Sequence, residues 1–179
     1  FQYCTSLATA PELPAESLAE YCSSDMFTGC KSLTNLPELP DYFQFLATGC
    51  FKGMFQDCTA LTTAPELSAY QLGEYCCQNM FSNCTSLTTA PMLHVVFSLA
   101  ADCFAGMFYG CTKLSSVKLF IEPEINDYFN PHFYLSNWLN GAGTKADSPQ
   151  LYLGGGIYYY YNDHRDDCTN ESLFPENWT

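Results

Sequence analysis

The sequence has little positive charge. Of its 179 residues only six are Lys or Arg, against 19 Asp or Glu, which gives a formal net charge of −13. Nucleic acids and anionic lipid surfaces carry negative charge, so this balance argues against both as partners. The sequence also lacks a run of about 18 apolar residues, the length that spans a bilayer. We therefore expect no membrane insertion of this segment.

The sequence also lacks the motifs of common catalytic sites. It contains no Gly-x-Ser-x-Gly, no His-Glu-x-x-His and no P-loop. Its three histidines, His94, His132 and His164, are far apart along the chain, whereas catalysis needs groups that converge in a pocket. We expect neither an enzymatic activity nor a cofactor.

What the sequence does contain is repetition. The dipeptide Met-Phe begins at Met26, Met54, Met80 and Met107, so that successive units are 28, 26 and 27 residues long. A longer match recurs as CTSLATAPEL at 4–13, CKSLTNLPEL at 30–39, CTALTTAPEL at 58–67 and CTSLTTAPML at 84–93. Phe1 occupies the phenylalanine position of a unit without the preceding Met, so we expect the chain to begin inside a unit. Periods of about 20–29 residues are typical of leucine-rich repeats.

The two halves of a unit differ in periodicity. Leu18, Cys22 and Met26 follow an i, i+4, i+8 spacing, which predicts a helix with one buried stripe. The half represented by residues 7–13 has the rhythm of a short strand, which its proline shortens further. A single unit cannot bury its apolar face, but stacked units can. We predict an α/β repeat fold: a leucine-rich-repeat solenoid with short parallel strands and one helix per repeat, plus a C-terminal cap.

The repeated unit MFxxCTSLTTAPELPA, followed by Leu-Ala and a second Cys, resembles the BspA-like leucine-rich repeats of surface and secreted proteins of gut Bacteroidales. Residues 136–141 and 174–179 look like the segments that close such arrays. The resemblance covers about residues 1–120, with units beginning near 1, 26, 54, 80 and 107. It implies an extracellular or cell-surface location in a bacterium, adhesion or ligand binding, and no catalytic residues. Residues 121–179 would form the cap, with a Tyr-rich hairpin or loop.

Two cysteines recur in each unit, one four residues before Met and one four residues after it. They form two predicted structural ladders: Cys22, Cys50, Cys76 and Cys103 in one, and Cys30, Cys58, Cys84 and Cys111 in the other. Because cysteine is often fully buried, we favour free thiols in the core. Disulfides within or between units are an alternative. Zinc is less favoured because metal-ligand spacing is missing.

Candidate binding residues lie where the unit is interrupted, because repeated positions are explained by folding. Aromatic rings and histidines there are good contact groups. The candidates are Tyr42, Phe43, Phe45, Tyr70, Phe97, Tyr128, Phe129, His132, Tyr158 and Tyr160. The alternative is that each ring packs onto its own unit. We predict a non-catalytic extracellular protein-binding or adhesion module whose partner is a protein or glycan.

Two other functions are compatible with the sequence. The chain could be a purely structural segment of a larger surface protein. It could also bind carbohydrate with the help of a cation, through the Tyr-rich segment and the acidic loop beside it. The weak metal-ligand candidates are Asp163, His164, Asp166 and Asp167. A solvated loop is the simpler interpretation of these four residues.

Overall fold

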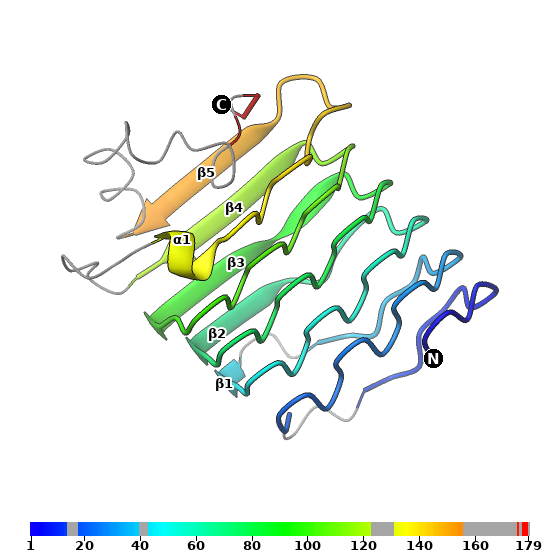
Figure 1. Cartoon of the computed structure of the whole chain (residues 1–179), viewed down its shortest axis with the longest axis horizontal. Coiled ribbons are helices and arrows are strands. Elements are labelled where there is room, and N and C mark those ends of the chain that lie inside the picture. Colours follow the sequence, from blue (N-terminus) through cyan, green and yellow to red (C-terminus); the bar gives the residue numbers. More distant parts are fainter. Residues whose placement is uncertain (14–17, 40–42, 123–130, 156–174, 176, 179) are drawn as a thin grey trace.

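The chain winds into a stack of coils with parallel strands along one side, as Figure 1 shows for a computed structural model. The structure describes residues 1–13, 18–39, 43–122, 131–155, 175 and 177–178. Five strands form one sheet in the order β1-β2-β3-β4-β5, and every neighbouring pair is parallel. They are β1 Phe43–Leu46, β2 Leu67–Leu72, β3 Thr89–Ser98, β4 Ser116–Ile121 and β5 Gln150–Gly155. The predicted repeat solenoid with short parallel strands is confirmed.

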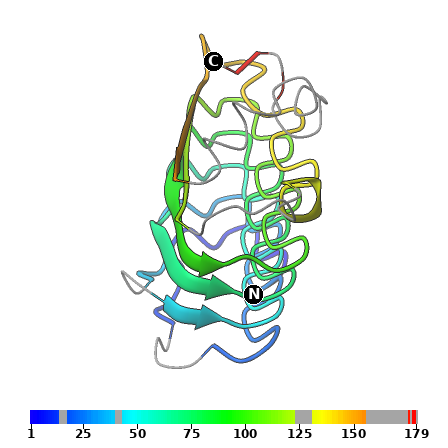
Figure 2. The same cartoon turned by 90° about the vertical axis from the view of Figure 1, so that its left-hand side faces the viewer.

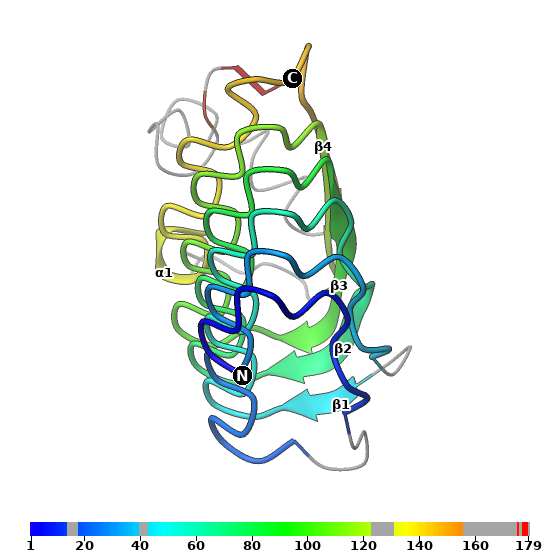
Figure 3. The same ribbon diagram turned by 90° about the vertical axis from the view of Figure 1, so that its right-hand side faces the viewer.

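The prediction of one helix per repeat is wrong. In the part of the chain that the structure describes, the only helix is the four-residue α1, Pro131–Tyr134. The segments expected to be helical are chains of tight turns, which lie in register from coil to coil on the side opposite the sheet (Figures 2 and 3). The fold is therefore a β-solenoid.

Backbone hydrogen bonding in these turns alternates between two kinds of partner. The N–H groups of Ser24, Met26 and Thr28 bond to the carbonyl three residues earlier in the same coil. The intervening N–H groups donate to the next coil instead, from Asp25 to Lys52 at 2.8 Å and from Phe27 to Met54 at 2.9 Å. An α-helix would use its interior N–H groups within the segment. Here half of them hold neighbouring coils together.

A period of four explains why the turns were mistaken for a helix. Tyr21, Asp25 and Gly29 all have positive φ angles, of 54°, 54° and 72°. Each turn repeats after four residues, so apolar side chains line up at i, i+4, i+8. Over three positions this spacing is the same as that of a helical stripe. The sequence did contain a contrary signal, because Gly, Asn and Asp favour the left-handed region and recur at this interval.

Stacked phenylalanine rings form the axis of the core. Neighbouring rings have centroids 5.5–5.9 Å apart and interplanar angles of 3–15°. The ladder consists of Phe1, Phe27, Phe55, Phe81 and Phe108, and it ends on the ring of Trp138, 6.3 Å from that of Phe108. Such spacings suit offset aromatic stacking, worth about 0.5–1.5 kcal/mol per pair beyond area burial.

The described C-terminal residues extend this stack by another coil. Residues 131–155 supply β5 and the fully buried Trp138, so the solenoid continues past the predicted end of the array at residue 120. The indole N–H of Trp178 donates to the carbonyl of Ala142 at 3.3 Å. The Trp178 side chain is also buried.

The cysteines of the second ladder are hydrogen-bond donors inside the core. In each unit the thiol after Met-Phe donates to the phenylalanine carbonyl of the preceding coil. The Sγ to O distances are 3.1 Å for Cys30 to Phe1, 3.2 Å for Cys58 to Phe27, 3.1 Å for Cys84 to Phe55 and 3.0 Å for Cys111 to Phe81. This geometry ties each thiol to the aromatic ladder.

All ten cysteines within the described ranges are free thiols. Cys4 and Cys22 are exposed and the other eight are buried. Cys22 was predicted to belong to a buried ladder, and in the structure it is exposed. Burial raises the pKa of the Cys58 and Cys111 thiols to about 12. These groups are protonated at neutral pH, which suits their role as donors. Cys168 lies outside the described residues.

The aromatic ladder makes a prediction about stability. Phe81 is buried between two other rings, so Phe81→Ala should lower the free energy of unfolding by about 3–5 kcal/mol. Tyr109→Ala, at an exposed turn position, should change it by less than about 1 kcal/mol. Urea denaturation of both variants checks this. Equal losses would contradict a central role for the ladder.

The buried thiols make a prediction about alkaline pH. Burial raises the pKa of these thiols in the folded protein. Their contribution to the free energy of unfolding is therefore fully present below their ordinary pKa of 9.0 and is lost as pH rises toward about 12. Serine keeps a donor but does not titrate in this range. The free energy of unfolding of Cys58→Ser/Cys111→Ser should therefore fall less between pH 8 and pH 11 than that of the unaltered protein. Identical losses would refute the assignment.

Candidate functional site

The outer surface of the sheet carries the largest side chains that the strands leave exposed. Along β3 and β4, residues alternate between the core and solvent, as a pleated strand requires. Leu93 and Leu119 point inward and are fully buried. We define the aromatic face as the exposed outward set Tyr70, Met92, Phe97, Phe120 and Tyr152. It extends over β2, β3, β4 and β5, which lie side by side in Figure 1.

A bulge in β3 brings two of these rings together. The register with β2 shifts, since Ala69 pairs with Val95 but Gln71 pairs with Ser98. Two residues of β3 thus oppose the single residue Tyr70, and the extra residue re-aims Phe97 outward. The rings of Tyr70 and Phe97 stack with centroids 5.1 Å apart and planes 3° from parallel. Phe97 is still 57% exposed.

Two further rows cross the face. In the first, Met92 pairs with Lys118 and Lys118 with Tyr152, and the Lys118 ammonium lies 5.9 Å from the centre of the Tyr152 ring. This is cation–π distance. In the second, Phe120 lies next to Gly154, and a Cβ on Gly154 would collide with the Phe120 ring. The glycine therefore lets an aromatic ring lie flat against the strand.

Carboxylates border the aromatic face. Glu122 accepts a hydrogen bond from, or pairs with, the His94 ring at 2.8 Å. Glu66 accepts the backbone N–H of Met92, also at 2.8 Å. The face therefore interleaves its apolar side chains with Lys118 and with the His94–Glu122 pair. Such a surface suits contact with another molecule.

The predicted site residues differ in their exposure and in their contacts. Tyr70 and Phe97 are brought together, and Phe45 is 52% exposed near the end of β1, next to β2. Phe43 is only 7% exposed and packs edge-on against Phe51, so its ring belongs to the core. His132 falls in α1, and its side chain lies outside the described part of the structure. Outside the described residues lie Tyr42, Tyr128, Phe129, Tyr158 and Tyr160, and also Asp163, His164, Asp166 and Asp167.

Sequence reasoning missed Met92, Lys118, Phe120 and Tyr152. Met92 and Phe120 sit inside or just after the repeated unit, which was assigned to folding alone. Alternation in Ser116–Ile121 was the available signal, since Lys118 and Phe120 are out of phase with Val117, Leu119 and Ile121. The positions that repeat in the core therefore alternate with positions that face solvent.

Comparison of the chain with protein-family models, curated proteins and solved structures gives no match. Within the described ranges, none of the helices has the length and apolar character needed to cross a membrane. No group of three or more metal-ligating side chains occurs among those same residues.

The stacked pair makes a prediction about coupling. A double-mutant cycle of Tyr70→Ala and Phe97→Ala should give an interaction energy of about 0.5–1.5 kcal/mol, the usual range for stacked rings. Urea denaturation of the two single variants and the double variant measures it. Additive losses would mean that the two rings do not stack in solution.

Proposed function

We propose that this chain is a non-catalytic recognition or adhesion module that binds a protein through the aromatic face. The observation that carries the proposal is the Tyr70–Phe97 stack, held outward by the bulge in β3, with Phe120 and Tyr152 exposed on β4 and β5 of the same sheet. Aromatic side chains on a rigid element are typical anchors of protein interfaces.

Charge favours a neutral or basic partner. The chain carries a net charge of −13, and Glu66 and Glu122 border the aromatic face. Complementary charge would speed association and make it sensitive to salt. Collagen, laminin and fibronectin are suitable test proteins because they are large extracellular matrix proteins.

The repeated unit supports an extracellular setting. We infer membership of the BspA-like leucine-rich repeats, and with it a place at a bacterial surface or in secretion, from the recurrence of the whole unit. The competing proposal of a purely structural segment predicts no binding by the aromatic face. The cation-dependent carbohydrate site rests on the Tyr-rich segment beyond the described residues and stays a prediction.

Binding to surfaces coated with collagen, laminin and fibronectin tests the proposal. At least one should bind, and Tyr70→Ala or Phe97→Ala should weaken binding by about tenfold or more, equal to about 1.4 kcal/mol. Tyr109→Ala removes a ring whose exposure lies between those of Tyr70 and Phe97 from the turns opposite the sheet, so it is the matched control and should bind as the unaltered protein does. Failure to bind all three proteins, or binding unaffected by the sheet variants, would favour the structural segment.

A further inference from the structure

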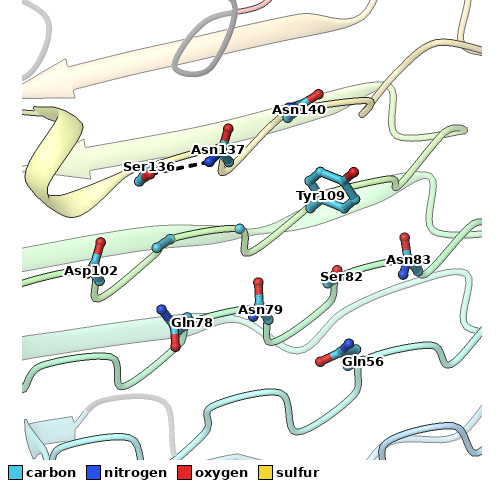
Figure 4. A pocket seen from close by; sticks show the side chains of 12 residues that line it. Gln56, Gln78, Asn79, Ser82, Asn83, Asp102, Tyr109, Ser136, Asn137 and Asn140 are labelled. Carbon is cyan, nitrogen blue, oxygen red and sulfur yellow. Dashed lines mark hydrogen bonds between the residues drawn. The ribbon is translucent and has the colours of Figure 1, made fainter.

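A polar hollow lies on the turn side, opposite the aromatic face (Figure 4). Its volume is about 620 Å³, in the range of small-molecule sites. The hollow forms where Ala105 and Gly106, which have little or no side chain, leave space above the backbone. A Cβ on Gly106, whose φ is +62°, would collide with the Asn79 side chain. The hollow is thus built into the backbone of the turns.

Carboxamides line this hollow on both sides of the coil that carries Asp102 and Tyr109. They are Gln56, Gln78, Asn79, Asn83, Asn137 and Asn140. Figure 4 shows Gln78, Asn79 and Asn83 on one side of the coil that carries Tyr109, and Asn137 and Asn140 on the other side. Parallel neighbouring backbones in such a stack are ~4.8 Å apart. The two groups of amides are therefore two coil spacings, roughly 10 Å, apart along the solenoid axis, about the length of two pyranose rings in an extended sugar chain.

Much of the hydrogen-bonding capacity in the hollow is unused. The side chains of Gln78, Asn79 and Asn140 make no hydrogen bond to any other residue within the described ranges. The side chain of Asn83 donates to Asp57 at 2.9 Å, and that of Asn137 to Ser136 at 3.5 Å. Each carboxamide presents two donor hydrogens and an acceptor oxygen. This arrangement suits ligands whose groups both donate and accept.

The charge and the aromatic ring in the hollow narrow the ligand class. Asp102 is the one charged lining residue among those described, so a phosphate, sulfate or carboxylate would meet no cation and one anion. Tyr109, 46% exposed at the rim, offers a ring face. Sugars combine hydroxyls that donate and accept with an apolar C–H face that packs on aromatic rings.

We propose that this hollow is a binding site for a neutral, extended oligosaccharide. Sugar rings would lie along the solenoid axis, with their hydroxyls bonded to Gln78, Asn79 and Asn140 and one ring packed on Tyr109. This site is separate from the aromatic face and does not depend on protein binding there. The molecule would then present two faces with different ligands.

Titration with cellotetraose, maltotetraose and chitotetraose, followed by calorimetry and backbone amide NMR, tests the site. A heparin tetrasaccharide serves as the anionic comparison. At least one neutral tetrasaccharide should bind and shift amide resonances within 78–83, 105–110 and 136–140. Gln78→Ala and Tyr109→Ala should each weaken binding by about tenfold. Tyr109→Phe keeps the ring and should stay within about threefold of the unaltered protein.

Phe97→Ala is the matched control for this site, since it removes an exposed ring from the opposite side and should leave saccharide affinity unchanged. Failure of all three neutral tetrasaccharides to bind would overturn the proposal, as would binding of the heparin fragment alone. Saccharide binding lost in Phe97→Ala but retained in Gln78→Ala would also overturn it. The matrix-protein assay has its own decisive variants, so either proposal can fail without the other.

Discussion

Stacking of one phenylalanine per coil is the interaction on which the rest of this solenoid depends. The rings of Phe27, Phe55 and Phe81 repeat at 5.5–5.7 Å, and no single coil could bury its own ring. Each unit must therefore bring its phenylalanine directly above the phenylalanine of the preceding coil. Unit lengths vary from 26 to 28 residues, and this variation is absorbed elsewhere in the coil.

The division of backbone hydrogen bonds follows from this stacking. Where alternate N–H groups in the turns donate to the next coil, as Asp25 and Phe27 do, adjacent coils are held in register on the side away from the sheet. The second cysteine of each unit adds a thiol donor to the phenylalanine carbonyl below it. On the other side of the solenoid, hydrogen bonds between parallel strands hold adjacent coils in register. Both surfaces of the solenoid are consequently rigid.

Rigidity lets the outward positions differ without disturbing the core. The sheet presents stacked aromatic rings bordered by carboxylates, whereas the turns present carboxamides around Gly106. A protein surface suits the first and sugar hydroxyls suit the second. Each surface holds side chains from several coils. A ligand would therefore contact several units at once, and its binding would depend on the order in which they are stacked.

The sequence by itself determined the repeat, its length, the stacked architecture and the inward positions of the Phe and second Cys residues. These follow from identity between units and from the need to bury apolar groups. Only the tertiary structure decided between helix and turns, because a period of four and a period of 3.6 nearly coincide over the three positions Leu18, Cys22 and Met26. It also decided that Phe43 is buried while Phe97 faces outward, since that depends on a bulge in the pairing of β2 with β3. The amide hollow could be found only from the tertiary structure, because its side chains come from coils about 27 residues apart in the chain and meet only when the coils are stacked.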